Sequence, residues 1–294
     1  MTATAMPESR PTNWVFLGDS LTEGVGSKRE TFVTELAKQL RVSETRSVHD
    51  LRFREVDPDQ FNPFIRVNLA GYWCADDRPA PGALWLWNLG SEARTIDNDL
   101  RWLPFLQNLR PERVFIHRGS LESILRPHCW ARGRWPWWVP RSWRGLVSMD
   151  PRCYFSETWW RRLKQTTIDI AKQTVRHRLL RQEAAAPLME METLFAHYRD
   201  LLQALHRLPT NITILGLLPP EERTFPGSAG HFAAVNAKLR ALARECDADF
   251  LDWAIDFHRA GEMRFYRDGF HPNAEGARHM AKILHHRLIQ LRVI

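Results

Sequence analysis

Several residue patterns that would assign this 294-residue chain to a special class are missing. Its cysteines, Cys74, Cys129, Cys153 and Cys246, are scattered, without the spacing of a metal site or the density of a disulfide framework. We therefore expect free thiols in a reducing compartment. No apolar run approaches the roughly 18 to 20 residues of a spanning helix. Residues 1–13 lack the pattern of a secretory signal, which predicts a cytoplasmic protein.

Cofactor signatures are missing as well. The chain has no glycine-rich phosphate loop, and its histidines, including His285 and His286, show no spacing that would gather three metal ligands. We expect no metal and no other cofactor. The net charge of +7 suits anionic partners. Nucleic acid is not expected among them, because the basic residues form no recognised binding motif.

Short apolar runs alternate with helix-period segments in the first part of the chain. Strands are expected at 14–17, 84–89 and 113–117, and helices at 31–40 and 95–109. This order predicts parallel strands joined by helical crossovers, with helices on both faces of the sheet. Residues 43–83 interrupt the order and are interpreted as a surface excursion, with a possible extra strand at 64–69.

A second interruption follows Glu122. Residues 126–151 mix Trp, Arg, Gly and Pro without periodicity. Helices are then expected at 157–182 and 188–208, a strand at 212–217, a helix at 232–246, a strand at 250–252 and a helix at 274–291. We predict a single α/β domain over residues 1–294, a three-layer sandwich around a parallel sheet of about five strands. A Trp/Arg-rich helical insertion, or lid, is expected at about 123–208.

Ser20 lies in the sequence Gly18-Asp19-Ser20-Leu21, at the end of the first expected strand. Functional groups gather at the carboxyl ends of parallel strands. A serine at this point is also close to a helix start, whose backbone N–H groups favour developing negative charge. This position suits a nucleophile, although a serine that only caps the helix is the alternative.

Near the other end of the chain, Asp268 and His271 lie three residues apart in Asp268-Gly269-Phe270-His271-Pro272. A serine hydroxyl needs a base to remove its proton, and the base needs a carboxylate to fix its tautomer. We therefore predict Ser20 as nucleophile, His271 as general base and Asp268 as the group that orients it. The alternative is that Asp268 caps the last helix and His271 only packs there.

Taken together, these two segments resemble the first and last signature blocks of the SGNH, or GDSL, hydrolase family. Four further segments look similar to the family, namely Asn88-Leu89-Gly90, Arg113 to Gly119, Leu217 to Pro220 and Ala274-Glu275-Gly276. Residues 43–83 and 123–208 fall outside the resemblance. It implies a flavodoxin-like fold, an acyl-enzyme intermediate and an oxyanion hole made by the N–H groups of Ser20 and Gly90. Gly71 is a rival for the oxyanion glycine.

The third family block departs from the expected pattern. Where the family has glycine, any residue, asparagine and aspartate, this chain has Gly119-Ser120-Leu121-Glu122. Leucine cannot donate a hydrogen bond, and loss of one oxyanion donor costs roughly a hundred- to a thousandfold in rate. Slower hydrolysis, a substitute donor such as Asn88 or Arg118, or loss of hydrolysis all remain open. We take Asp19, Asn88, Arg118, Leu121 and Glu122 as candidate substrate-binding residues.

Tryptophan and arginine are interleaved in the expected insertion. The tryptophans are Trp130, Trp135, Trp137, Trp138, Trp143, Trp159 and Trp160. Tryptophan gives large apolar contact area, and arginine grips phosphate or carboxylate. A lid over an acyl substrate, a peripheral contact with a membrane or protein, and a second small core with buried tryptophans remain open alternatives.

These observations predict a serine-dependent esterase that acts on an O-acyl group of a sugar, lipid or small metabolite. An acyltransferase that uses the same Ser-His-Asp site is one alternative. A non-catalytic binding protein on this fold is the other, and Leu121 is the residue that favours it.

Overall fold

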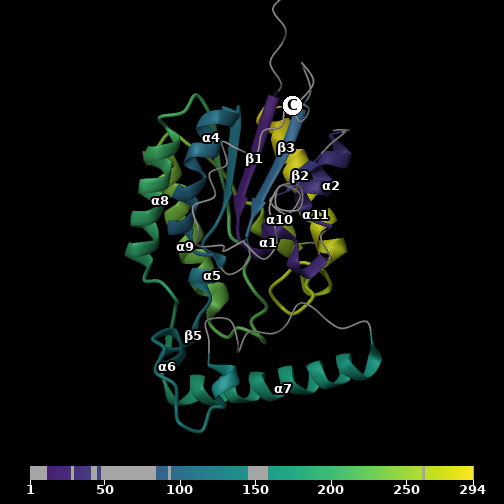
Figure 1. The fold of residues 1–294 in the computed structure, drawn as a ribbon, viewed down its shortest axis with the longest axis vertical. Helices are drawn as coiled ribbons and strands as arrows, with labels where there is room; N and C mark the ends of the chain where they lie inside the picture. The colour runs from purple at the N-terminus through teal and green to yellow at the C-terminus, as the bar shows by residue number, and fades with distance from the viewer. Residues whose placement is uncertain are drawn as a thin grey trace, which may run out of the picture.

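The computed structural model describes residues 12–27, 30–40, 45–47, 84–91, 94–144, 158–259 and 262–293. At its centre lies a parallel sheet of six strands in the order β2-β3-β1-β4-β7-β8 (Figure 1). In this order the strands are Thr45–Ser47, Leu84–Gly90, Thr12–Gly18, Arg113–His117, Asn211–Leu215 and Asp249–Leu251. Without the short edge strand β2, this is the flavodoxin-like strand order. The predicted fold class is confirmed.

The edge strand β2 corrects one expectation. Residues 45–47 fall in the segment interpreted as a surface excursion, yet they pair with β3 from Leu86 to Asn88. The sheet therefore has six strands in place of about five. The possible strand at 64–69 and the rival glycine Gly71 lie outside the described residues.

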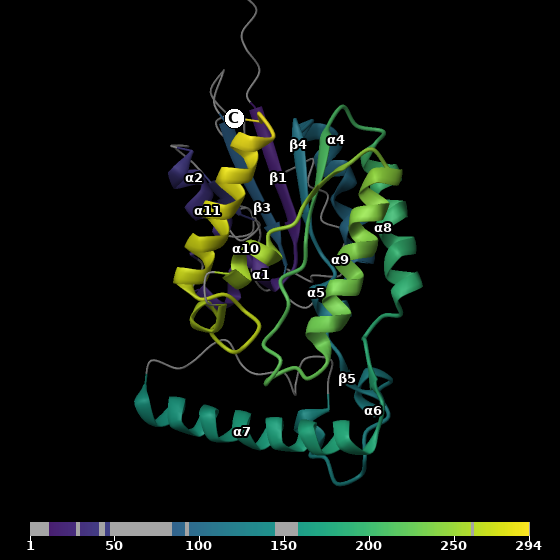
Figure 2. The ribbon, with the colours of Figure 1, turned by 180° about the vertical axis from the view of Figure 1, so that it is seen from behind.

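Helices cover both faces of the sheet (Figures 1 and 2). One face carries α4 (Leu103–Leu109), α8 (Met191–Leu205) and α9 (Ser228–Glu245), and the other carries α2 (Phe32–Gln39), α10 (Ala254–Arg259) and α11 (Ala274–Gln290). Side chains of β1 alternate between the two cores, with Val15 and Leu17 in the first and Trp14 and Phe16 in the second. Because both faces are buried, the central strands are continuous apolar runs.

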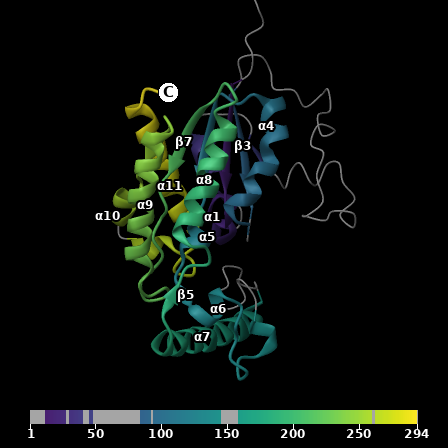
Figure 3. The same ribbon diagram turned by 90° about the vertical axis from the view of Figure 1, so that its left-hand side faces the viewer.

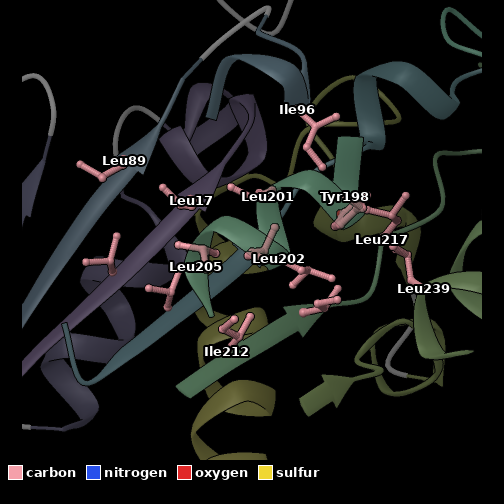
Figure 4. Packing of buried hydrophobic residues seen from close by; sticks show 14 of the residues in the cluster. Leu17, Leu89, Ile96, Tyr198, Leu201, Leu202, Leu205, Ile212, Leu217 and Leu239 are labelled. Carbon is pink, nitrogen blue, oxygen red and sulfur yellow. The ribbon is translucent and has the colours of Figure 1, made fainter. Parts of the chain in front are cut away.

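The core beneath α8 shows this packing at close range (Figure 4). Leu201, Leu202 and Leu205 recur at helical spacing, and none of the three is exposed to solvent. They lie in one cluster with Leu17 of β1 and Leu89 of β3. The cluster fixes the strands whose carboxyl ends carry the candidate site.

The expected helix at 95–109 consists of two parts. Residues Ile96–Trp102 form the 3-10 helix η5, and α4 begins at Leu103, with Pro104 in its first turn. Proline is well tolerated at the start of a helix, where no intrahelical N–H bond is lost. The short helices α10 and η7 (Glu262–Phe265) were not predicted, because neither is long enough to show a period.

The insertion forms a separate layer at one end of the molecule (Figure 3). Its elements are β5 (Arg126–Pro127), α6 (His128–Ala131), the 3-10 helix η6 (Arg141–Trp143), α7 (Trp159–Gln182) and β6 (Ala185–Ala186). Strands β5 and β6 pair antiparallel, and α7 lies across the end of the molecule beyond α5 (Ser120–Ser123). Among the described residues, no helix has the length and apolar character needed to cross a membrane.

Two of the four cysteines lie in the described part of the chain. Cys129 and Cys246 are free thiols there. Cys74 and Cys153 lie outside the described residues.

Candidate active site

Ser20 is the first residue of the short helix α1 (Ser20–Glu23), which begins directly after β1. The preceding residue, Asp19, caps this helix, because its Oδ1 accepts a hydrogen bond of 3.0 Å from the Leu21 N–H. The capping role that the sequence left open for Ser20 therefore belongs to Asp19. The Ser20 hydroxyl points instead toward the C-terminal part of the chain.

The structure brings Ser20 and His271 together although 251 positions separate them. Ser20 Oγ lies 2.9 Å from His271 Nε2, and His271 Nδ1 lies 2.7 Å from Asp268 Oδ2. A carboxylate accepts only, so Nδ1 carries the proton and Nε2 is left as an acceptor for the serine hydroxyl. This arrangement is that of a nucleophile, a base and a group that fixes the tautomer of the base.

Asp268 is held by its own loop. Its Oδ1 accepts hydrogen bonds from the backbone N–H groups of Phe270, at 3.0 Å, and His271, at 2.7 Å. The last helix, α11, is capped by another residue, because Asn273 Oδ1 accepts from the Gly276 N–H at 2.9 Å. Asp268 is therefore not the N-cap residue of α11.

Burial differs along this chain of three residues. The Asp268 side chain is 2% exposed and that of His271 is 13% exposed, while Ser20 as a residue is 9% exposed. The ring of Phe270 meets that of His271 edge to face at 4.8 Å. The carboxylate is therefore shielded from solvent, whereas the imidazole and the hydroxyl retain access for a small reacting group.

Two neighbouring strands anchor the helix that carries Ser20. Asn88 of β3 donates from Nδ2 to the Thr22 carbonyl at 2.8 Å. Thr22 Oγ1 lies 3.1 Å from Nδ1 of His117, the last residue of β4. Burial lowers the pKa of His117 to about 4, so this imidazole is neutral. Sequence reasoning missed Thr22 and His117, although His117 occupies the carboxyl end of its strand, where functional groups gather.

The backbone N–H of Gly90, the expected oxyanion donor, forms a hydrogen bond within the end of its own strand. This N–H donates to Asn88 Oδ1 at 2.9 Å. A Cβ at Gly90 would clash with the backbone of Glu23, and one at Gly18 would clash with the side chain of Thr22. Both glycines permit the close approach of α1 to the strand ends. In this structure the Gly90 N–H is thus bonded within the end of β3, and its role as an oxyanion donor stays a prediction.

The two expected substitutes for the missing asparagine are also engaged elsewhere. The Asn88 amide connects the Gly90 N–H to the Thr22 carbonyl. Arg118 is completely buried and binds Asp99 through two hydrogen bonds of 2.7 Å, and its Nη1 donates to the Arg94 carbonyl at 3.0 Å. A buried bidentate pair of this kind is structural. Both side chains are therefore already hydrogen-bonded in this structure, and their use as substitute donors stays a prediction.

Glu122 and Leu121 lie in α5, directly after β4. Glu122 is buried, and its Oε1 accepts from the Ile96 N–H at 2.8 Å. Leu121 is 7% exposed, and its carbonyl accepts from Arg126 Nη1 at 2.9 Å. Glu122 thus ties η5 to α5, and its expected role in substrate binding stays a prediction.

The Glu122 carboxyl makes folding depend on pH. Burial raises its pKa from 4.5 to about 7, which the nearby Asp19 reinforces and Arg118 opposes. The folded state therefore retains a proton that the unfolded state loses. This contribution to stability is complete below about pH 4.5 and is lost as the pH rises through about 7.

Glu122→Gln, which imitates the protonated acid, should remove this dependence. The native chain should lose thermal stability relative to the variant as the pH rises. The midpoint of the variant minus that of the native chain should therefore be about 2 to 5 °C larger at about pH 8 than at about pH 5. Differential scanning fluorimetry across this range measures the difference. A constant difference would show that Glu122 is ionised throughout.

Comparison with known proteins adds the family. The model of the GDSL-like lipase/acylhydrolase family matches residues 161–279, a stretch that contains Asp268 and His271. The matched stretch of this chain is similar to this family. The predicted recognition and the predicted enzyme class, a hydrolase of ester bonds, are confirmed. The match takes in residues 161–208, which the sequence motifs had left outside the resemblance, and Ser20 precedes it.

Several solved structures share the fold of this chain at low sequence identity. A catalytic mutant of Axe2, an acetylxylan esterase from Geobacillus stearothermophilus, is 14% identical with a TM-score of 0.52, over 95% of this chain and 94% of that chain. A putative acylhydrolase from Bacteroides fragilis is 13% identical with a TM-score of 0.50, over 97% and 91%. TesA is 14% identical with a TM-score of 0.50, over 95% and 99%. No curated protein matches the sequence.

Proposed function

We propose that this acylhydrolase cleaves esters through an acyl-enzyme intermediate on Ser20. The chain of hydrogen bonds from Ser20 Oγ through His271 to Asp268 carries the proposal. Ser20 Oγ attacks the ester carbonyl while His271 Nε2 takes the hydroxyl proton, and the alcohol leaves with that proton. Water then attacks the acyl group, His271 again transfers the proton, and Ser20 is released. Asp268 remains ionised and stabilises the imidazolium.

The oxyanion hole proposed here is weaker than the family pattern implies. The Ser20 N–H belongs to the first residue of α1, where backbone N–H groups have no intrahelical acceptor. Leu121 cannot donate a second hydrogen bond from its side chain. Hydrolysis through one such amide is expected to be slow for an enzyme of this family.

Leu121→Asn should therefore accelerate the reaction. One well-placed oxyanion donor is worth roughly a hundred- to a thousandfold, and a newly introduced side chain should recover part of this. We expect kcat/KM for an activated ester to rise about tenfold or more. Leu121→Ala is the matched control, since it removes the same buried side chain without adding a donor. Equal rates for both variants would show that position 121 does not face the oxyanion.

The substrate class that we propose is a short O-acyl ester, such as an acetyl group on a sugar. Two observations support it. The hydroxyl and imidazole are only slightly exposed, which suits a small acyl group. In addition, Axe2, which shares the fold, is described as an acetylxylan esterase. Esters of lipids and small metabolites remain within the same chemistry.

A panel of esters tests this proposal. The native chain should release acetate from acetylated xylo-oligosaccharides and should cleave 4-nitrophenyl acetate faster than the octanoate. Failure to cleave any ester would refute the hydrolase. If added alcohols captured the acyl group in preference to water, the same intermediate would serve an acyltransferase.

We also propose that residues 123–208 belong to the same single domain and that the layer from β5 to β6 within them acts as a lid, since α8 packs in the core on the sheet. Arg176 of α7 rests on the ring of Phe225 at 4.0 Å, and Phe225 packs against Phe270 at 5.8 Å. Phe270 in turn contacts the ring of His271. This continuous path of ring contacts couples the position of α7 to the proposed general base.

A further inference from the structure

Helix α7 exposes large apolar side chains to solvent, whereas a helix of a globular protein usually buries them. Trp159 is 74% exposed, Trp160 50%, Leu163 61% and Ile170 60%. At 100° per residue, positions 159, 163 and 170 fall within one narrow stripe of the helix, and position 160 borders it. Several large apolar side chains exposed along one helix mark a candidate interaction site.

The stripe faces away from the rest of the molecule. On the opposite side of α7, Asp169, Lys172 and Arg176 are all less than 9% exposed. Arg176 points to the body of the protein, since its guanidinium lies over Phe225. The apolar stripe is therefore on the outer side of the helix, at the end of the molecule seen in Figure 3.

The loop between α6 and η6 adds two exposed tryptophans beside the other half of α7. Trp137 is 89% exposed and Trp138 is 37% exposed. The Arg178 guanidinium lies over the Trp138 ring at 5.6 Å, which places the loop beside the C-terminal half of α7. We call the combined patch, Trp137, Trp138, Trp159, Trp160, Leu163 and Ile170, the tryptophan surface.

The charge around the tryptophan surface is strongly positive. On α7 the exposed charged side chains include Arg161, Lys164, Arg178 and Arg181, whereas its one acidic residue, Asp169, is buried. Arg178 and Arg181 follow the apolar stripe and are exposed, as are Arg134 and Arg141 in the neighbouring loop. Exposed indole rings beside arginines match the boundary between lipid headgroups and acyl chains. Anionic headgroups also complement the positive charge.

We propose that the tryptophan surface docks this protein onto an anionic lipid bilayer, with α7 lying in the plane of the interface. Helix α7 crosses the end of the molecule at which β1 passes into α1 (Figure 1). Docking therefore places the lipid at the same end of the molecule as Ser20, with α7 between them. The proposal rests on the exposed side chains alone and does not require Ser20 to be catalytic.

Co-sedimentation of the full chain with vesicles tests the proposal. Vesicles of phosphatidylcholine with phosphatidylglycerol should bind the native chain about tenfold or more tightly than vesicles of phosphatidylcholine alone. Raising the salt concentration should weaken this binding, because the charges are exposed. Ser20→Ala should bind like the native chain, which separates this proposal from the proposed esterase.

Matched variants locate the contact. The triple change Trp159→Ser, Leu163→Ser and Ile170→Ser should weaken binding to the anionic vesicles about tenfold or more. The control is Ile255→Ser with Ile289→Ser, at residues 52% and 49% exposed on other helices, and should bind like the native chain. Circular dichroism verifies that both variants fold. No binding by the native chain, as expected if the surface serves a protein partner, or unchanged binding by the folded triple variant overturns the proposal.

Discussion

Ser20→Ala is expected to lower kcat/KM for ester hydrolysis by about ten thousandfold or more. The change removes the only atom that can form the acyl-enzyme bond in the proposed mechanism. His271 and Asp268 remain in place, so the residual rate would come from substrate binding and from water activated by the imidazole. Steady-state hydrolysis of 4-nitrophenyl acetate measures the loss, and thermal unfolding verifies the fold.

Ser120→Ala is the matched control for this change. Ser120 is buried in α5, and its Oγ has no hydrogen-bond partner among the described residues. Loss of the Ser120 hydroxyl should leave kcat/KM within about threefold of the native value, because a substitution that breaks no hydrogen bond usually has a small effect. Retention of more than a tenth of the native activity by Ser20→Ala would contradict the assignment of the nucleophile.

Asp268→Asn is expected to lower kcat about a thousand- to ten thousandfold, with little change in KM. The asparagine oxygen can still accept from the backbone N–H groups of Phe270 and His271, so the loop should keep its shape. Its NH₂ group then faces His271 Nδ1, which must become an acceptor. The proton moves to Nε2, and the imidazole can no longer accept the serine proton.

Asp252→Asn supplies the control for the carboxylate. Asp252 pairs with Arg240 and accepts a hydrogen bond of 3.3 Å from the Ala254 N–H, and in the described part of the chain it is bonded to none of Ser20, Asp268 and His271. Its replacement should leave kcat unchanged within about twofold, because exposed ion pairs contribute little. A kcat for Asp268→Asn within tenfold of the native value would show that His271 does not depend on this carboxylate.

The central strands could be predicted from the sequence, and so could the proximity of Ser20 to Asp268 and His271. Strands β1, β3 and β4 are apolar runs buried on both faces, and such runs are visible without a structure. Strand β2 is not, because Thr45-Arg46-Ser47 has no apolar residue and only its pairing with β3 defines it. Ser20, Asp268 and His271 could be placed at one edge because parallel strands share the direction of their carboxyl ends.

The use of the hydrogen-bonding groups around the site could not be predicted. The N–H of Gly90 is bonded because the Asn88 side chain folds back along its own strand end. Arg118 is withdrawn from the site because Asp99, on another element, provides a bidentate partner. Each outcome depends on a side-chain conformation that sequence spacing does not encode. The pattern of residue types therefore indicated the edge of the sheet but not the function of each residue there.

In the insertion, hydrophobic periodicity does not predict which side of a helix is buried. The expected helix at 157–182 is confirmed as α7, but its buried side carries Asp169, Lys172 and Arg176 while its exposed side carries Trp159, Leu163 and Ile170. A hydrophobic period would assign these faces in reverse. Of the tryptophans in the insertion, Trp130 is buried beneath Arg126 and Arg176, whereas four others are exposed. Both a small core and an exposed surface are therefore present.

Labelling with a fluorophosphonate tests the proposed nucleophile most directly, because phosphonylation requires a serine that is both accessible and activated by a base. Mass spectrometry of the digested native chain should show one adduct, on the peptide that contains Ser20, and none on Ser20→Ala. A folded native chain that remains unlabelled at Ser20, or that is labelled only at another residue, would contradict the proposal.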